Sequence, residues 1–486
     1  MRHLLPRRSF SSLPLHQPNV WDVVIVGGGI VGSTLACLLN SSPSPLRVAV
    51  IEPQVPSLLT SPDLRVYTLA PSTISILKRA NVWDTIPSEL KCPFTAMQVW
   101  DTAEISSLLF TATEVGRENM GNVVEHNVLH NALYSEIQKI AKHQNDAENF
   151  KVYEERVGGY TAASSTSRFP SITLTSGETL TSRLVVAADG GNSFIRKTAA
   201  LGTWGREYDQ VAVVATVQTE TVHSTAWQRF LKTGPVALLP MRDGMTSVVW
   251  SCSIEMANSL TSMSDADFVE QLNTVLHLLG DTQAATSCNN TIPIVQDIQS
   301  AVSTVLSAAA LTAPRMVTPP TVTAAIGSRM SFPLKMQLSN AYCTPGMALV
   351  GDAAHTVHPM AGQGLNLGFS DVDALWKEIN FAIEHGLDLG SMTVLQRYAS
   401  HRQKANTSMA LTLDGLKHLF SNDAPILPFL RNVGLGTLNG LPIIKVILFK
   451  LFLKFENELF FFVEGNHASC YGSLNDFHYN SWEYKS

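Results

Sequence analysis

The pattern of apolar and polar positions near the start of the chain predicts a strand, a helix and a second strand in succession. Residues 21–26 (WDVVIV) form a short apolar run of the kind that fills a buried strand, and residues 47–51 (RVAVI) form another. The segment from Gly29 to Leu39 has the spacing of a helix. Because this order gives parallel strand pairing, the sequence predicts an α/β fold.

The pattern changes farther along the chain. Residues 184–188 (LVVAA) repeat the buried-strand pattern. Between about 205 and 251, the runs VAVVATV, VALLP and TSVVWS are separated by turn residues, which is typical of a β-rich layer. The Ser- and Thr-rich residues 158–168 predict a hairpin or a linker, and a helix is predicted between Ser264 and Gly280.

Composition narrows the classes of function. A chain of 486 residues with 45% hydrophobic content can bury more than one core, so we expect two domains. A net charge of -6 and a pI near 6.2 argue against a nucleic-acid partner. The six cysteines are scattered and no histidine stands at ligand spacing, so we expect reduced thiols and no metal site.

The first residues have the composition of a targeting segment. Arg2, Arg7 and Arg8 stand among several serines, and no acidic residue precedes Asp22. This is typical of a mitochondrial presequence and lacks the apolar core of a secretory signal, although a disordered basic tail is the alternative.

A glycine-rich loop stands between the first predicted strand and helix. Its sequence has the form G-x-G-x-x-G, with glycines at 27, 29 and 32. Gly27 permits the tight turn, Gly29 lets the backbone approach a pyrophosphate, and Gly32 lets the helix pack on the strand. Glu52 follows the second strand, where an acid can bind a ribose hydroxyl. This predicts a dinucleotide site without distinguishing FAD from NAD.

A second glycine-rich segment, residues 351–372 (GDAAHTVHPMAGQGLNLGFSDV), favours FAD. Asp352 follows an apolar strand, so its carboxylate can accept a hydrogen bond from a ribityl or ribose hydroxyl. Gly362 and Gly364 place backbone amides at the start of a helix. Such amides would stabilise negative charge on a reduced flavin. A glycine turn that merely caps the helix is the alternative.

A third segment begins with Asp189 and Gly190 and ends at Arg196, again after a buried strand. By itself it would be an ordinary turn followed by a surface charge. The three segments in this order, however, resemble the FAD-dependent aromatic hydroxylases of the para-hydroxybenzoate hydroxylase type.

The chain more closely resembles the ubiquinone-biosynthesis branch of that family, specifically its mitochondrial ring hydroxylases, and this resemblance implies hydroxylation at ring carbon 5. The resemblance runs from about residue 21 to the C-terminus and is weakest over 283–325. One departure is His126, where the branch has Asn. Besides residues 351–372, the segments that carry the resemblance are residues 63–66, 97–101, 121–133, 227–231, 234–240, 249–251 and 331–334.

The resemblance implies FAD as the cofactor and gives roles to particular residues. Arg65 would lie near the flavin, with a surface salt bridge as the alternative, and Pro359 would lie against the isoalloxazine. His355 and His358 are the two candidates for proton transfer, with packed histidines as the alternative. The implied FAD-binding residues are Gly27, Gly29, Gly32, Glu52, Arg65, Asp189, Asp352, Pro359, Gly362, Gly364, Leu365 and Asn366.

The resemblance also implies a division of the chain. It predicts a presequence (1–20), a Rossmann-like FAD-binding domain (21–90, 125–200 and 330–400), a β-rich substrate domain (91–124 and 201–329) and a C-terminal helical region with an apolar tail (401–486).

The implied reaction is hydroxylation of a polyprenylated phenol by O2 through a flavin C4a-hydroperoxide. The chain has no second G-x-G-x-x-G, and the resembling branch takes electrons from a ferredoxin and its reductase. Two alternatives remain: an FAD-dependent epoxidase or reductase of isoprenoid lipids, and a flavin-stabilised structural subunit of a biosynthetic complex.

The tail from 443 to 465 is apolar, but lysines and glutamates interrupt it, so it is not predicted to span a membrane. One helical stripe holds Ile444, Leu448, Phe452, Phe455 and Leu459. The stripe predicts either core packing or attachment to a membrane surface or a membrane-bound partner. A prenylated substrate favours attachment on the matrix side of the mitochondrial inner membrane.

Overall fold

A computed structural model of the chain describes residues 20–42, 44–56, 61–101, 107–143, 149–165, 167–277, 317–359 and 362–421. The expected presequence, apart from its last residue, and the apolar tail at 443–465 lie outside these residues.

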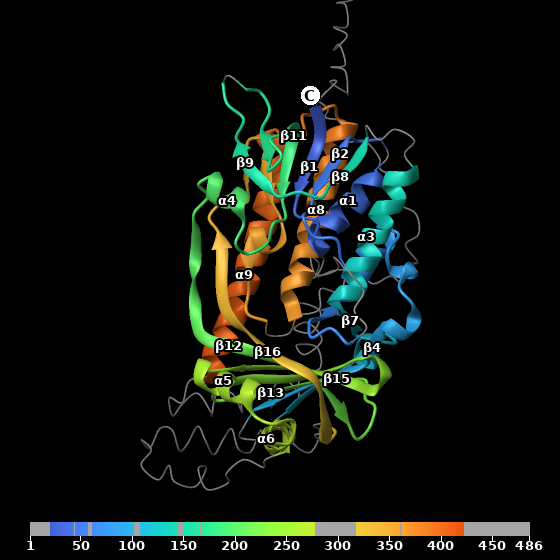
Figure 1. Cartoon of the computed structure of the whole chain (residues 1–486), viewed down its shortest axis with the longest axis vertical. Coiled ribbons are helices and arrows are strands. Elements are labelled where there is room, and N and C mark those ends of the chain that lie inside the picture. The colour runs from blue at the N-terminus through green and yellow to red at the C-terminus, as the bar shows by residue number, and fades with distance from the viewer. Residues whose placement is uncertain are drawn as a thin grey trace, which may run out of the picture.

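The first of two large sheets is built on parallel strands that are buried on both faces. It has eight strands in the order β17-β18-β11-β1-β2-β8, with β10 and β9 added beside β11 (Figure 1). Parallel pairing joins β1 to β2 and β11, β2 to β8, and β11 to β18. Near-continuous apolar runs suit strands that are covered on both sides. The strands are β1 (Val20–Val26), β2 (Val48–Ile51), β8 (Phe150–Tyr153), β9 (Val157–Thr161), β10 (Ser171–Leu174), β11 (Thr179–Ala187), β17 (Cys343–Thr344) and β18 (Met347–Leu349).

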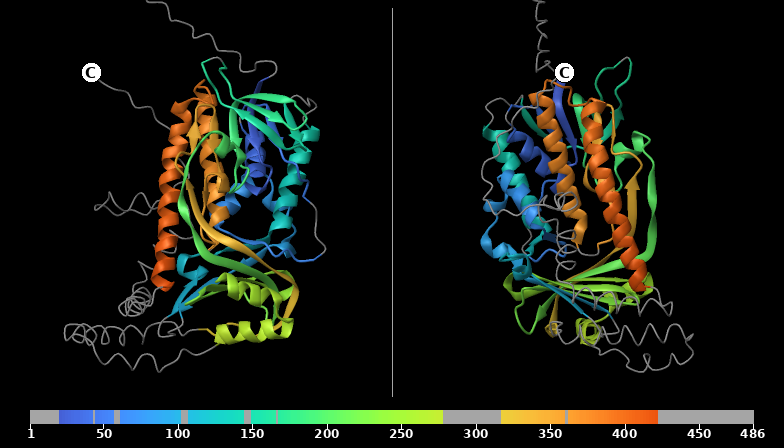
Figure 2. Two further views of the ribbon diagram at one scale, coloured as in Figure 1. Left: turned by 60° about the vertical axis from the view of Figure 1, so that its left-hand side comes forward. Right: turned by 180° about the vertical axis from the view of Figure 1, so that it is seen from behind.

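Helices pack around this sheet. In the core, α1 packs against α3 and α8, and α8 packs against α9, which lies beside it in both views of Figure 2. The larger helices here are α1 (Ile30–Asn40), α2 (Pro71–Arg79), α3 (His126–His143), α8 (Gln363–Glu384) and α9 (Met392–Ser421), with the short α4 (Phe194–Thr198). None of the helices within the described ranges is both long and apolar enough to cross a bilayer.

The second sheet is mostly antiparallel. Its order is β19-β16-β12-β15-β14-β13-β5-β6, and β13 pairs with β5 in parallel. Helices α5 (Ile254–Ser262) and α6 (Asp265–His277) cover a core that includes Trp100, Trp227 and Trp250. The strands are β5 (Ala96–Asp101), β6 (Ser107–Thr111), β12 (Thr203–Thr219), β13 (Thr225–Leu231), β14 (Gly234–Pro240), β15 (Met245–Cys252), β16 (Val322–Ser339) and β19 (His355–Thr356).

Two kinds of connection join the large sheets. The long strands β12 and β16 run from the level of the first sheet into the second (Figure 1). A small sheet of β3 (Val66–Leu69), β7 (Gly121–Glu125) and β4 (Cys92–Phe94) lies between α3 and the second sheet. The short 3-10 helices are η1 (Trp83–Thr85), η2 (Ser88–Leu90), η3 (Ala112–Val115), η4 (Arg242–Gly244) and η5 (Gly351–Ala353).

The structure confirms the predicted α/β class, with a Rossmann-like half, a β-rich half and a helical C-terminal region. The predicted strand, helix and strand at 21–51 correspond to β1, α1 and β2. Of the predicted hairpin or linker at 158–168, residues 158–161 belong to β9, which pairs antiparallel with β10. The predicted domain limits at 329 and 400 fall inside β16 and α9. The domain division therefore crosses continuous elements and stays a prediction.

Candidate FAD site

The glycine loop after β1 adopts a conformation that larger residues would disrupt. Gly27 has a φ of +101°, and a Cβ there would lie 2.4 Å from the carbonyl oxygen of Ala188. A Cβ on Gly32 would lie 1.9 Å from the carbonyl oxygen of Gly27. The first helical turn therefore packs directly on the loop.

The N-terminus of α1 faces open space. Gly29 is the N-cap, no side chain caps the helix, and a Cβ on Gly29 would meet no atom within 4 Å. The first backbone amides of α1 therefore have room for an anion, and the helix dipole favours one there. This is the fit expected for the pyrophosphate of FAD.

Glu52 lies at the same loop, at the end of β2. Its carboxylate accepts the backbone amides of Gly28 at 2.8 Å and of Gln54 at 3.0 Å. A carboxylate has capacity for further donors, so Glu52 can fix the loop and still accept a ribose hydroxyl.

The Asp189 segment is tied to the segment that contains Asp352. The buried Arg196 donates to the carbonyl oxygens of Ala353 at 2.6 Å and Gly191 at 2.8 Å. It is therefore an internal bridge and not a surface charge. Asp189 accepts the amide of Ile195 through Oδ2, whereas its buried Oδ1 has no hydrogen-bond partner among the described residues. An orphaned buried oxygen of this kind fits a ligand hydroxyl.

Asp352 lies in η5, directly after β18. Its side chain is open to solvent, yet the surrounding protein raises its pKa above the ordinary value, partly offset by His355 and Lys335. The Asp352 carboxylate is therefore reachable from solvent although protein atoms surround it.

The start of α8 presents a second free helix end. Gly362 is the N-cap with a φ of +60°, no side chain caps the helix, and the Gly362 amide donates to the carbonyl of Pro359 at 3.0 Å. A Cβ on Gly364 would approach only Val357, at 3.8 Å. The backbone amides of Gly364 and Leu365 therefore belong to a helix N-terminus that can stabilise an anion.

The side chain of Asn366 is fully used within the protein. Its Oδ1 accepts the amide of Ala70 at 3.0 Å and the hydroxyl of Thr73 at 2.7 Å. Its Nδ2 donates to the carbonyls of Thr68 at 2.8 Å and Gly362 at 3.1 Å. Asn366 thus anchors the turn before α8, so any contact with a cofactor would come from its backbone.

The two free helix ends lie on the same side of the molecule. A Cβ on Gly368 of α8 would lie 2.9 Å from Cγ2 of Val31, and Trp376 donates to the carbonyl of Leu38 at 2.9 Å. Because both contacts advance in the same direction, α1 and α8 run parallel. Their positive ends and the Asp352 carboxylate can therefore meet one extended ligand.

Arg65 is exposed, and its guanidinium makes no ion pair within the described part of the chain. Desolvation raises the pKa of the neighbouring Tyr67 to about 12, with Arg65 opposing the shift and Asp352 adding to it. Arg65, Tyr67 and Asp352 therefore share one electrostatic neighbourhood.

His355 is part of a fully buried network. Its Nε2 lies 2.5 Å from Asp371 Oδ2, and Asp371 also accepts Arg402 Nε at 2.8 Å and Asn406 Nδ2 at 2.9 Å. Burial alone would raise the pKa of Asp371, but His355 and Arg402 hold that pKa well below its usual range. The sequence analysis missed Asp371, Arg402 and Asn406. The four-residue spacing of Asp371 from Leu367 and Leu375 was the available signal.

His358 is buried against a different group. Its ring lies 5.2 Å from the ring of Tyr208 in an edge-on arrangement. Burial, reinforced by Lys417 and opposed by Asp414, lowers the pKa of His358 to about 4. At neutral pH the ring is uncharged.

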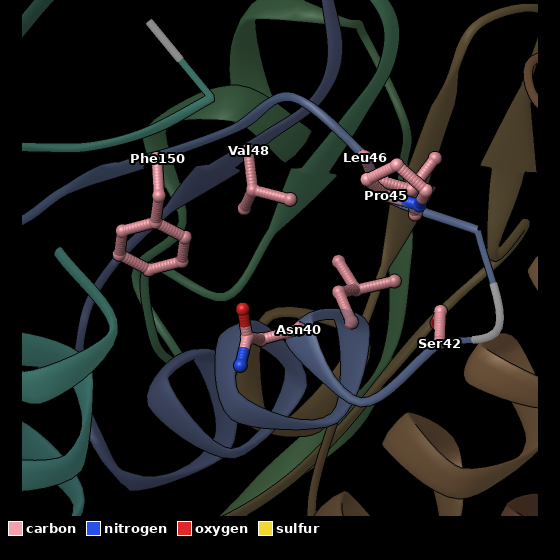
Figure 3. A pocket seen from close by; sticks show the side chains of 7 residues that line it. Asn40, Ser42, Pro45, Leu46, Val48 and Phe150 are labelled. Atoms are coloured by element: carbon pink, nitrogen blue, oxygen red, sulfur yellow. The ribbon is translucent and has the colours of Figure 1, made fainter. Parts of the chain in front are cut away.

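A small cavity elsewhere does not suit FAD. It has a volume of about 210 Å³ and is lined by Asn40, Ser42, Val48 and Phe150 among others, whose side chains surround it in Figure 3. It lies at the C-terminal end of α1, where the helix dipole disfavours phosphate. Within the described ranges, no group of three His, Cys, Asp or Glu side chains could hold a metal.

The FAD binding domain family matches residues 20–291 and 296–410 of the chain. The mitochondrial ubiquinone biosynthesis monooxygenase of Mus musculus is 35% identical over 447 residues, covering 88% of this chain and 90% of that protein. The Escherichia coli (strain K12) 3-demethoxyubiquinol 3-hydroxylase is 32% identical over 424 residues, covering 86% of this chain and 94% of that protein.

Solved structures agree on the fold. Para-nitrophenol 4-monooxygenase from Pseudomonas putida has a TM-score of 0.64 at 17% identity, over 89% of this chain and 98% of that one. A Klebsiella pneumoniae protein complexed with FAD has a TM-score of 0.57 at 14% identity, over 89% and 99%. The chain is therefore an FAD-dependent monooxygenase, and it belongs to the FAD binding domain family and, within it, to the ubiquinone biosynthesis monooxygenases.

Proposed function

We propose that this monooxygenase hydroxylates the aromatic ring of a polyprenylated phenol during ubiquinone biosynthesis, at ring carbon 5. The observation that carries the proposal is similarity to ubiquinone biosynthesis monooxygenases over 88% of the chain. The glycine-rich segment around Asp352 is arranged for a flavin, because a solvent-open carboxylate and a free helix N-terminus lie within it.

The described residues suggest how FAD would be held. The amides of α1 would bind the pyrophosphate, Glu52 a ribose hydroxyl, and Asp189 and Asp352 further hydroxyls of the cofactor. The amides at the start of α8 would face the N1–C2=O edge of the flavin, with Arg65 and Pro359 beside the ring. The β-rich residues 91–124 and 201–329 would form the substrate domain. FAD would supply the activation of O2, while the protein positions the phenol and excludes bulk water.

Neither candidate histidine is assigned as the base that removes the phenol proton. His355 donates to Asp371 inside a sealed network, and a group with a pKa of about 4, such as His358, holds a proton poorly at pH 7. His355 instead joins the segment after β18 to α8 through Asp371, and His358 packs against Tyr208 of β12.

The test of this function is chemical. In cells that lack the protein, mass spectrometry should reveal a prenylated quinone precursor that is short of one ring hydroxyl group. Expression of the chain should remove that precursor. Accumulation of an unepoxidised or unreduced isoprenoid lipid would favour the alternative enzyme, and restoration by a variant that binds no FAD would favour a structural subunit.

We propose a ferredoxin and its reductase as the electron donors. The support is the resemblance together with the single G-x-G-x-x-G at 27–32. Stopped-flow mixing with NADPH alone should reduce the bound flavin slowly, and addition of a ferredoxin and its reductase should support turnover. Reduction by NADPH at the rate of turnover, without a partner, would refute this.

We further propose that the protein is mitochondrial and bound peripherally to the matrix side of the inner membrane, within a ubiquinone-biosynthesis complex. Support comes from the basic leader, the relatives' description as mitochondrial, and the apolar stripe within 443–465. Truncation after Gly440 should release the protein from liposomes of anionic lipid while the FAD absorbance remains. If the truncated protein loses its flavin and aggregates, the stripe belongs to the core.

A further inference from the structure

The carbonyl of Gly28, in the middle of the glycine loop, is held by two donors from different helices. The hydroxyl of Ser33, in α1, donates to it at 2.6 Å. The Nε2 atom of His130, in α3, lies 2.9 Å from the same oxygen. A carbonyl oxygen can only accept, so the His130 Nε2 atom must carry a proton, and the two donors occupy both lone pairs of the oxygen.

This arrangement fixes the direction of the next amide. In a trans peptide, the N–H of Gly29 points opposite to the carbonyl of Gly28. The Gly28 amide, which belongs to the preceding peptide, donates to Glu52 at 2.8 Å, so the peptides on both sides of Gly28 are held by hydrogen bonds. The Gly29 N–H therefore points away from His130 and Ser33.

The space beside the Cα of Gly29 is open, since a Cβ placed there would meet no atom within 4 Å. The uncapped first turn of α1 begins at the same point. An amide whose direction is fixed in advance by its own peptide needs no reorientation when a phosphate binds beside it.

The ring of His130 is itself held in place. It packs on the ring of His126 with centroids 5.4 Å apart, one turn earlier on α3. His126 Nδ1 in turn lies 3.0 Å from the hydroxyl of Tyr67, in β3.

We infer that His130 is a positioning residue for the pyrophosphate of FAD, acting through the carbonyl of Gly28. It does not touch the cofactor. It orients the Gly28–Gly29 peptide from α3 so that the Gly29 amide joins the first amides of α1 in binding the phosphates.

The test compares His130→Leu, which fills space without a donor, with His130→Gln, whose amide nitrogen can replace Nε2. FAD binding to apo-protein is followed by the quenching of flavin fluorescence. We expect His130→Leu to raise the FAD Kd about five- to tenfold, and His130→Gln to stay within about twofold of the wild type. The thermal midpoint of the apo-protein should be the same in both variants. Asn131→Ala, which removes a side chain that donates to the backbone carbonyl of Asn127 on the same helix, is the matched control and should bind as the wild type.

Three outcomes would overturn the inference: unchanged FAD affinity in His130→Leu, equal weakening in His130→Leu and His130→Gln, or a fall in apo-protein stability that parallels the loss of affinity. If His130→Leu does not fold, Ser33→Ala removes the other donor and must show the same loss of FAD affinity. These measurements involve no phenol, so they stand apart from the proposed substrate.

Discussion

Asp352 is exposed to solvent and still sits among enough protein to raise its pKa. A cofactor hydroxyl that binds this carboxylate would make a charge-assisted hydrogen bond in a partly desolvated place. Asp352→Ala should therefore cost on the order of 1.5–3 kcal/mol of binding, which is a roughly tenfold to hundredfold higher FAD Kd. Titration of apo-protein with FAD measures this, and Asp352→Asn, which keeps one acceptor oxygen, should lose less. An unchanged Kd would make Asp352 only a turn residue.

His358 should make the folded protein less stable as the pH falls below about 6.5. Its pKa falls from an unfolded value of about 6.5 to about 4 in the folded protein. Since the unfolded chain binds the proton more readily, the contribution of His358 is fully present above pH 6.5 and declines as the pH falls towards 4. Between pH 7.5 and pH 5, the protein should therefore lose on the order of 2 kcal/mol of unfolding free energy through His358.

Urea unfolding of apo-protein at pH 7.5 and pH 5 tests this effect. His358→Gln has no titrating ring, so its free energy of unfolding should change less between the two pH values than that of the wild type. An identical change in the two proteins would mean that His358 is not the source.

Single residues differ in how far the sequence foretells them. The conformations at Gly27 and Gly32 depend on neighbours within a strand–turn–helix unit, so the motif alone predicts them. His130 contacts a residue 102 positions away, and no local spacing reports such a contact. From the motif, Asn366 is predicted to be a cofactor ligand, yet its side chain already forms hydrogen bonds with Thr73, with the carbonyl of Thr68 and with nearby backbone atoms.

At the scale of elements, the contact between α8 and α9 depends on the carboxylate of Asp371. It accepts four donors, from Gly351, His355, Arg402 and Asn406, and its side chain is fully buried. Asp371→Asn would leave the Arg402 charge buried without its counter-ion, which should cost about 3–5 kcal/mol of unfolding free energy.

The neighbouring Asp373 provides a control on the same helix. It pairs with Arg79 and Lys377, whose side chains are 40% and 54% exposed, so Asp373→Asn should cost no more than about 1 kcal/mol. Chemical denaturation of both variants measures the difference. Equal losses would show that the buried network contributes no more than a surface pair.

Helices and strands also differ in how well the sequence pattern predicts them. β1, α1 and β2 are predicted because each has an uninterrupted apolar pattern. In α9, by contrast, the buried face that includes Tyr398 continues through Arg402 and Asn406, so polar side chains interrupt its apolar stripe. The small sheet is hidden for another reason, because β3 finds its partner β7 more than fifty residues later.

At the scale of the molecule, residues from both large sheets surround the cofactor segments. Gly191, next to Asp189, lies beside Thr356 of β19 and Lys335 of β16 in the second sheet. The small sheet is tied to η4 by an ion pair of Glu125 with Arg242 at 2.6 Å. Composition gave the expectation of two cores, but it could not show that continuous strands such as β12 join them.

Because these segments come from distant parts of the chain, FAD should stabilise the whole fold. A ligand that binds only the folded state adds about 2.7 kcal/mol to the unfolding free energy at one hundred times its Kd, and about 4.1 kcal/mol at one thousand times. In Asp352→Ala, a tenfold weaker Kd should lower the gain by about 1.4 kcal/mol at the same FAD concentration. Near-ultraviolet circular dichroism would follow the packed tryptophans of both halves, among them Trp21 in the first sheet and Trp100, Trp227 and Trp250 in the core of the second, and the far-ultraviolet signal would follow the whole chain. We expect both transitions to shift together as FAD is added, since β12 and β16 pass through both halves. Two separate transitions, of which only one shifts as FAD is added, would show that the second sheet unfolds independently of the cofactor.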